Sequence, residues 1–188
     1  MFDDYKTKKS VVVVYTGEGK GKTSASLGLM ARALGANWKI AYIQFIKSWQ
    51  VNEHHFINEI MPIFKDKLFF YKGGAGFYHA GELSAKGVSD QEHKKQAQET
   101  YKMALACARS GEYDLVICDE INNAVNDGLL KKSAFAELTS SKHDKTSLCL
   151  TGRNYPATAE KYADIITNMT KVKHHFDKKY LANNGIDY

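Results

Sequence analysis

The chain has 188 residues and a mass of 21.1 kDa, and its 26 Lys and Arg against 21 Asp and Glu give a formal charge of +5 at pH 7. A hydrophobic content of 44% with only 2 prolines is typical of a globular domain and excludes a disordered or collagen-like chain. No apolar run approaches the roughly 20 residues of a membrane span, and the amino terminus lacks the apolar core of a secretory signal. We therefore expect a single cytoplasmic domain over residues 1–188 that has no membrane partner.

Stretches typical of strands and helices alternate along the chain. SVVVVY (10–15) is apolar on both faces, as expected of a buried strand in a parallel sheet. The longest helix is predicted after Ser89, an N-cap with Glu92 three residues later, and Gly111 stands just past its end. This alternation predicts an α/β fold, a three-layer sandwich with a mainly parallel central sheet covered by helices on both sides. Further strands are predicted at 39–46, 67–71, 114–119, 147–151 and 164–169, and further helices at 23–34, 52–60, 133–140 and 156–163.

A glycine-rich stretch, TGEGKGKT (16–23), lies between the first predicted strand and the first predicted helix. Its glycines allow successive backbone N–H groups to converge on a phosphate, and the helix that follows adds its positive end. Lys22 supplies a charge for the terminal phosphates, and the Thr23 hydroxyl suits Mg²⁺. The standard pattern, GxxxxGK(S/T), has glycine where Thr16 stands, but the strand and helix context is the one that a phosphate-binding loop requires. We predict that ATP is bound by Thr16, Gly17, Glu18, Gly19, Lys20, Gly21, Lys22, Thr23 and Ser24.

Two adjacent carboxylates follow the apolar run LVIC (115–118) at the end of a predicted central strand. The carboxyl ends of strands are where open α/β sheets bind ligands. Asp119 could hold Mg²⁺ together with Thr23, and Glu120 could point into the same site. Alone, each motif could be an ordinary glycine-rich turn or a charged strand end. Together, in this order, they predict a P-loop NTPase of the RecA-like type.

Other candidate residues follow strands at the same edge of the sheet. Arg153 could hold phosphate oxygens, or it could be a solvated arginine at a strand end. The stretch 72–87 is long for a connection and rich in glycine and aromatic residues, which is typical of binding loops. Phe77, Tyr78 and His79 in that stretch, and Trp49 after the second strand, could form a wall against a large planar ligand or pack into the core.

The cysteines and histidines do not form a metal-binding pattern. Cys107, Cys118 and Cys149 are widely spaced, odd in number and placed in apolar runs, so we expect small buried side chains. The pairs His54–His55 and His174–His175 have no partner cluster with the spacing of a zinc site.

Several blocks in order resemble the corrinoid adenosyltransferases, which transfer the 5′-deoxyadenosyl group of ATP to the cobalt of a corrinoid. TGEGKGKT resembles the family signature TG-x-GKGKT, in which threonine also stands at the position of Thr16. The resemblance extends over nearly the whole chain. Its further blocks are QFIK-x-W (44–49), the aromatic loop at 77–79, CDE (118–120), TGRN (151–154), KHHFD (173–177) and GIDY (185–188).

The sequence departs from the family pattern at three positions. Ser48 and Asn52 stand where the family usually has glycine. His79 stands where some members have tryptophan, two residues after the aromatic position that aligns with Phe77.

The resemblance implies the substrates and the roles of the candidate residues. ATP and a corrinoid (cobalamin, cobinamide or cobyrinic acid a,c-diamide) would be the substrates, and a reduced flavoprotein or flavodoxin-like protein would donate the electron that forms Co(I). The implied enzyme is a homodimer. The corrinoid would contact Trp49, Phe77 and His79, and Phe77 with residue 79 would displace the lower axial ligand of cobalt.

The chemistry that the resemblance implies needs charge neutralisation and not a general base. Co(I) is a strong nucleophile that attacks C5′ of ATP, so triphosphate leaves. Lys20, Lys22 and Arg153 would stabilise the leaving group with Mg²⁺ or Mn²⁺ held near Thr23, Asp119 and Glu120. The residues assigned to catalysis are Lys22, Glu120 and Phe77.

Two other functions fit parts of the pattern. A small-molecule kinase would use the same loop, carboxylates and arginine, but it would release ADP. A RecA-like ATPase acting on nucleic acid would fit the fold and the basic charge, but the sequence has no basic stripe with interleaved aromatic residues. We therefore expect no nucleic-acid partner.

Overall fold

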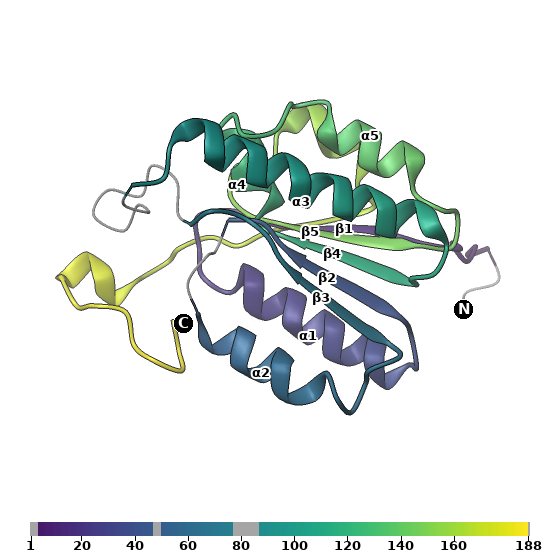
Figure 1. Ribbon diagram of the computed structural model, residues 1–188, viewed down its shortest axis with the longest axis horizontal. Coiled ribbons are helices and arrows are strands. Elements are labelled where there is room, and N and C mark those ends of the chain that lie inside the picture. Colours follow the sequence, from purple (N-terminus) through teal and green to yellow (C-terminus); the bar gives the residue numbers. More distant parts are fainter. Residues whose placement is uncertain (1–3, 47–49, 77–86, 188) are drawn as a thin grey trace.

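The protein is built around a six-stranded parallel sheet (Figure 1). The computed structural model describes residues 4–46, 50–76 and 87–187. The strand order across the sheet is β3-β2-β4-β5-β1-β6, and every described pairing is parallel. The strands are β1 (Val12–Thr16), β2 (Ile40–Gln44), β3 (Leu68–Lys72), β4 (Leu115–Asp119), β5 (Ser147–Thr151) and β6 (Ile165–Asn168).

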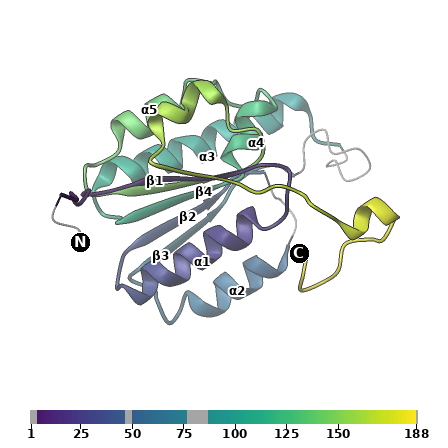
Figure 2. The same ribbon diagram turned by 180° about the vertical axis from the view of Figure 1, so that it is seen from behind.

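Helices cover both faces of the sheet, as Figures 1 and 2 show from opposite sides. On one face lie α1 (Lys22–Gly35) and α2 (Asn52–Ile60). On the other face lie α3 (Asp90–Ser110), α4 (Ile121–Asn126) and α5 (Ala134–Ser141). Two short 3₁₀ helices, η2 (Ala157–Tyr162) and η3 (His175–Lys178), complete the described elements. Within the described ranges, no helix combines the length and the apolar character needed to cross a membrane.

The strand sequences explain why the sheet is parallel and why helices cover both of its faces. All residues of β2, β4 and β5 are buried, which matches runs that are apolar on both faces. The register pairs Gln44 with Asp119, and Tyr15 with Thr151. Because parallel strands end at the same edge, this register brings the polar ends of β1, β2, β4 and β5 together.

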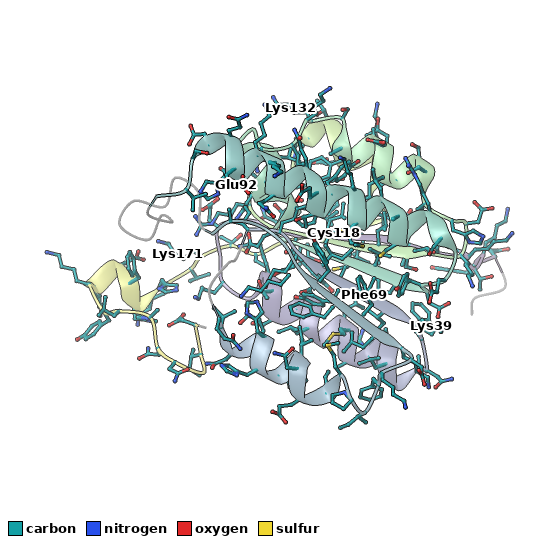
Figure 3. All side chains as sticks on the ribbon, viewed as in Figure 1. Lys39, Phe69, Glu92, Cys118, Lys132 and Lys171 are labelled. Carbon is teal, nitrogen blue, oxygen red and sulfur yellow. The ribbon has the colours of Figure 1, made fainter. Side chains whose placement is uncertain are left out.

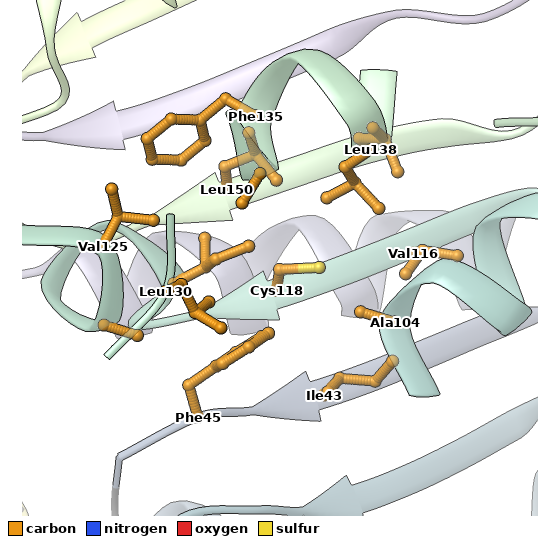
Figure 4. Packing of buried hydrophobic residues seen from close by; sticks show 14 of the residues in the cluster. Ile43, Phe45, Ala104, Val116, Cys118, Val125, Leu130, Phe135, Leu138 and Leu150 are labelled. Carbon is orange, nitrogen blue, oxygen red and sulfur yellow. The ribbon is translucent and has the colours of Figure 1, made fainter. Parts of the chain in front are cut away.

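The core is divided by the sheet into two layers. The layer under α3, α4 and α5 includes Phe45, Cys118, Phe135 and Leu150, which Figure 4 shows among the buried residues that pack against one another over the strands. The layer under α1 and α2 includes Met30 of α1, Ile40 and Tyr42 of β2, and Leu115 and Ile117 of β4. The three cysteines are free and buried, as predicted, and burial raises the pKa of the Cys107 thiol to about 11.

The structure differs from the sequence prediction in two elements. The predicted helix at 156–163 is the 3₁₀ helix Ala157–Tyr162, which follows Pro156. The six-residue helix α4 directly after Glu120 was not predicted, because it is too short to display helical periodicity. The strand predicted at 164–169 is present as β6, which is exposed along its length at one edge of the sheet.

We predict that Phe135→Ala lowers the free energy of unfolding by about 3–5 kcal/mol, because it leaves a cavity in the core. The Phe135 ring is fully buried and contacts the Tyr155 ring edge-on, with centroids 5.0 Å apart. Urea denaturation of the purified variant measures the change. The control is Ile63→Ala, at a side chain that is 74% exposed, where we expect a change within about 0.5 kcal/mol. Equal effects of the two substitutions would contradict the packing described.

Candidate nucleotide-binding site

The glycine-rich loop joins β1 to α1 in a conformation that glycine permits. Gly17 and Gly21 have φ values of 101° and 103°, in the left-handed region. A Cβ atom on Gly17 would lie 2.2 Å from Asn168 Oδ1, and one on Gly19 would lie 2.7 Å from the carbonyl oxygen of Met169. The loop is therefore shaped by backbone conformation and by close contact with the chain after β6.

Lys22 lies at the base of this loop with its side chain buried. Its Nζ donates hydrogen bonds to the carbonyl oxygens of Gly17 and Gly19, both at 2.7 Å. Burial lowers the pKa of Lys22, and the nearby Glu120 carboxylate opposes that shift. The ammonium group is thus held inside the loop, where it can meet an anion that the loop binds.

Asp119 ends β4 with a fully buried carboxylate that three neighbours contact. Thr151 Oγ1 donates a hydrogen bond to Oδ1 at 2.7 Å, and Gln44 Nε2 donates to Oδ2 at 2.9 Å. Thr23 Oγ1, at the start of α1, lies 3.4 Å from the same Oδ2 atom. The structure therefore brings Asp119 and Thr23 together, and their role in holding a metal stays a prediction.

Glu120 follows in a strained backbone conformation. Its φ is 65°, a left-handed value that is uncommon for a residue with a side chain. Its backbone N–H donates to Thr151 Oγ1 at 2.9 Å, and its carboxylate accepts a hydrogen bond from the Asn123 side chain. This turn aims the two consecutive carboxylates differently, with Asp119 buried and Glu120 lining a cavity.

Arg153 and Glu18 form an ion pair at the wall of the same cavity. Arg153 Nε lies 3.4 Å from Glu18 Oε2, and both side chains are more than half exposed. The backbone N–H of Arg153 donates to Asn123 Oδ1 at 2.7 Å. An exposed ion pair of this kind is worth little in stability, so Arg153 can exchange Glu18 for a phosphate at small cost.

The chain after β6, residues 169–187, is called here the C-terminal segment. Figures 1 and 2 show it leaving the sheet and returning beside the amino-terminal ends of α1 and α2. Figure 3 places Lys171 on this segment, outside the sheet layers. Gly19 N–H donates to the carbonyl oxygen of Met169 at 2.6 Å. Lys20 Nζ lies 2.7 Å from Asp187 Oδ1, and His175 Nε2 lies 3.3 Å from Asp187 Oδ2.

These parts surround a cavity of about 1230 Å³. Typical small-molecule pockets measure roughly 300–1,000 Å³, so this volume suits a large ligand or two ligands. From the predicted set, the lining includes Glu18, Gly19, Lys20, Gly21, Lys22, Thr23, Ser24, Glu120 and Arg153. Thr16 lies at the end of β1, where its hydroxyl accepts the backbone N–H of Tyr155 at 3.0 Å.

Comparison with known proteins identifies the family. Residues 8–188 match the family model described as ATP:corrinoid adenosyltransferase BtuR/CobO/CobP. The chain belongs to the ATP:corrinoid adenosyltransferase family. The enzyme is thus a transferase of adenosylcobalamin biosynthesis, with ATP and a corrinoid as its substrates.

Relatives named corrinoid adenosyltransferase match most of this chain. The protein from Pseudomonas aeruginosa is 27% identical over 96% of this chain and 85% of its own length. The protein from a Sinorhizobium species is 29% identical over 96% of this chain and 81% of its own length. The protein from Escherichia coli K12 is 25% identical over 96% of this chain and 87% of its own length.

The residues predicted to contact the corrinoid are not placed by the structure. Trp49, Phe77 and His79 lie outside the described residues, so their roles in the adenosyltransferase stay predictions. In the described part of the chain, no group of three or more His, Cys, Asp and Glu side chains could hold a metal ion. A cation at Asp119 and Glu120 would therefore need further oxygen ligands from Thr23 and from substrate phosphates.

Sequence reasoning missed several residues of the site of this adenosyltransferase. Gln44 and Thr151 were noted only as the first residues of the family blocks 44–49 and 151–154 and were given no role, although each ends a buried strand with a polar side chain beside the strand of Asp119. A polar residue at the end of a strand that is otherwise apolar was the signal in the sequence that could have identified them. Asn123 belongs to the unpredicted helix α4, and the contact between Asp187 and Lys20 joins segments far apart in the chain.

We predict that Gly19→Ala destabilises the adenosyltransferase by about 1–3 kcal/mol and weakens ATP binding. The added methyl group would press on the backbone of Met169 and displace the phosphate loop. The control is Gly28→Ala in α1, where a Cβ meets nothing within 4 Å and should stabilise the helix by about 0.5–1 kcal/mol. Denaturant unfolding and calorimetric ATP titration measure both effects. A Gly19→Ala protein as stable as the wild type would show that the described contact is wrong.

We predict that Asp187→Asn removes part of the acid sensitivity of folding. A hydrogen bond from Lys20, followed by one from the Asn183 backbone N–H, lowers the pKa of Asp187 from 3.8 to about 2. Because the folded pKa is depressed, the stabilisation is fully present above pH 3.8 and is lost as the pH falls towards 2. Urea midpoints measured between these pH values test this, with the exposed Asp66→Asn as control. Identical acid dependence in wild type and Asp187→Asn would refute it.

Proposed function

We propose that this chain transfers the 5′-deoxyadenosyl group of ATP to the Co(I) of a corrinoid and releases triphosphate. The observation that carries the proposal is the arrangement around the cavity. The phosphate loop with Lys22 faces the Asp119–Glu120 turn, and the remaining volume can admit a second, large substrate.

The proposed reaction is a substitution at C5′ of ATP. The electron pair of Co(I) forms the cobalt–carbon bond, and the C5′–O bond breaks with its electron pair going to triphosphate. No proton moves in this step, so the enzyme needs no general base. Its contribution is to hold the two substrates in line and to neutralise the charge of the leaving triphosphate.

The described residues fit that task. Lys22 provides a fixed charge inside the loop, and Arg153 and Lys20 carry exposed charges at the cavity wall. Each of the exposed cations is paired with a carboxylate, Glu18 or Asp187, that a triphosphate could replace. We assign Lys22 to catalysis on this basis, and Glu120 as a carboxylate that lines the cavity and can hold the metal. The role of Phe77, which with residue 79 would displace the lower axial ligand of cobalt, is proposed from the family resemblance alone.

Mg²⁺ or Mn²⁺ fits the donor set of this site. Thr23 Oγ1, the Asp119 carboxylate and the Glu120 carboxylate are hard oxygen donors, which these ions prefer. A bound ion would supply positive charge to the triphosphate. Because Asp119 is fully buried, we expect it to act through the Thr23 hydroxyl and water, whereas Glu120 reaches the cavity directly.

We further propose the partners that the family resemblance implies. A reduced flavoprotein or flavodoxin-like protein would supply the electron that forms Co(I), and the enzyme would act as a homodimer. The corrinoid would be cobalamin, cobinamide or cobyrinic acid a,c-diamide, and the resemblance implies that it contacts Trp49, Phe77 and His79.

The deciding experiment is anaerobic incubation of the pure protein with ATP, Mg²⁺ and chemically reduced Co(I) cobalamin. We expect a light-sensitive adenosylated corrinoid and triphosphate in equal amounts. Lys22→Ala should lower kcat/KM about 100-fold or more, because a preorganised charge on the leaving group is lost. Lys65→Ala, on the exposed loop before β3, is the matched control and should leave the rate unchanged.

The products also distinguish the alternatives. An unchanged cobalt spectrum with accumulation of ADP would overturn the proposal in favour of a kinase or an ATPase. ATP hydrolysis stimulated by DNA or RNA would favour a RecA-like ATPase.

A further inference from the structure

A buried chain of hydrogen bonds leads from the start of α2 to the carboxylate of Asp119. The backbone N–H of Val51 donates to His54 Nδ1 at 3.3 Å, and His54 Nε2 is hydrogen-bonded to Gln44 Oε1. Gln44 Nε2 then donates to Asp119 Oδ2 at 2.9 Å. The chain thus joins α2, β2 and β4, which are separate elements of the fold.

The direction of these hydrogen bonds follows from the backbone donor at one end. Since Nδ1 of His54 accepts from an N–H group, the ring hydrogen of a neutral His54 lies on Nε2 and is donated to Gln44 Oε1. Gln44 must then direct its amide N–H, and not its oxygen, at Asp119. The opposite orientation of the amide would place an oxygen against a carboxylate oxygen, which is repulsive.

Burial makes this orientation persistent. His54 is 2% exposed, and Gln44 and Asp119 are fully buried. Water does not compete effectively for such groups, and reversing one of them would break two hydrogen bonds in a medium of low dielectric constant. The parallel register also places Gln44 directly beside Asp119, so backbone pairing brings the two side chains together.

We propose that His54 is a positioning residue that, through Gln44, fixes the Asp119 carboxylate for binding of the metal–triphosphate group. Oδ2 of Asp119 receives the Gln44 amide and also faces Thr23 Oγ1, the hydroxyl that begins α1. Loss of the His54 donor frees the Gln44 amide to turn, and the carboxylate then loses its fixed orientation toward Thr23. The inference rests on the proposed role of Asp119 and Thr23 in holding the metal.

The test uses two substitutions that each retain one part of the imidazole. His54→Gln can place an amide N–H near the position of Nε2, so it should keep the donor to Gln44. His54→Asn can place an oxygen near Nδ1 but does not reach Gln44. We expect His54→Asn to weaken Mn²⁺ binding in the presence of ATP about tenfold, because partners of metal-binding carboxylates typically contribute 10–100-fold. The Mn²⁺ affinity of His54→Gln should stay within about twofold of the wild type, because this variant restores the hydrogen bond to Gln44.

The measurement is Mn²⁺ binding by electron paramagnetic resonance with ATP and without corrinoid. His55→Asn, at the exposed neighbour on the same helix, is the control and should bind Mn²⁺ as the wild type does. Thermal unfolding of each variant separates a loss of metal affinity from a loss of stability. If His54→Asn is folded and binds Mn²⁺ with wild-type affinity, or if both His54 variants lose affinity equally, the inference is wrong.

Gln44→Met keeps the test decisive if His54→Asn does not fold. This substitution preserves side-chain length and removes the amide, so it should also weaken Mn²⁺ binding about tenfold. Unchanged affinity in Gln44→Met would overturn the inference. The adenosyl-transfer assay on the wild type judges the proposed function separately, because Mn²⁺ affinity is measured without the corrinoid.

Discussion

The burial of the Asp119 carboxylate at the end of β4 is the constraint on which the site depends. A carboxylate in the interior costs several kcal/mol unless hydrogen bonds compensate it. Here the donors come from three other elements, with Thr151 on β5, Gln44 on β2 and Thr23 on α1. Satisfying this one charge therefore ties the neighbouring strands and the first helix together at the edge where the phosphate loop lies.

Thr151 also connects Asp119 to the turn that follows it. Its hydroxyl donates to Asp119 and accepts the N–H of Glu120, whose backbone is left-handed. The strain of that conformation is compensated by these contacts, and the result is a carboxylate directed into the cavity. Two adjacent acidic residues thereby have different environments, one buried beside Thr23 and one open to a ligand.

The C-terminal segment gives the cavity a third wall. Its Met169 carbonyl occupies the N–H of Gly19, and its Asp187 carboxylate pairs with Lys20. In this arrangement the groups of the loop that would meet a polyphosphate are matched to acceptors of the protein itself. These contacts keep the loop ordered when no nucleotide is bound. A bound nucleotide would replace some of them, so the positive charges of the loop stay available to it.

The sequence determined the parts of this protein that depend on neighbouring residues. Apolar runs such as 115–118 predict buried parallel strands, and the glycines and Lys22 of the loop predict a phosphate site, because periodicity and backbone freedom are local properties. The tertiary structure alone decided which distant side chains complete the site. Gln44 lies 75 residues from Asp119, and Lys20 lies far from Asp187. Only strand register and the path of the C-terminal segment bring them together, and neither can be predicted from a short stretch of sequence because both depend on contacts between distant residues.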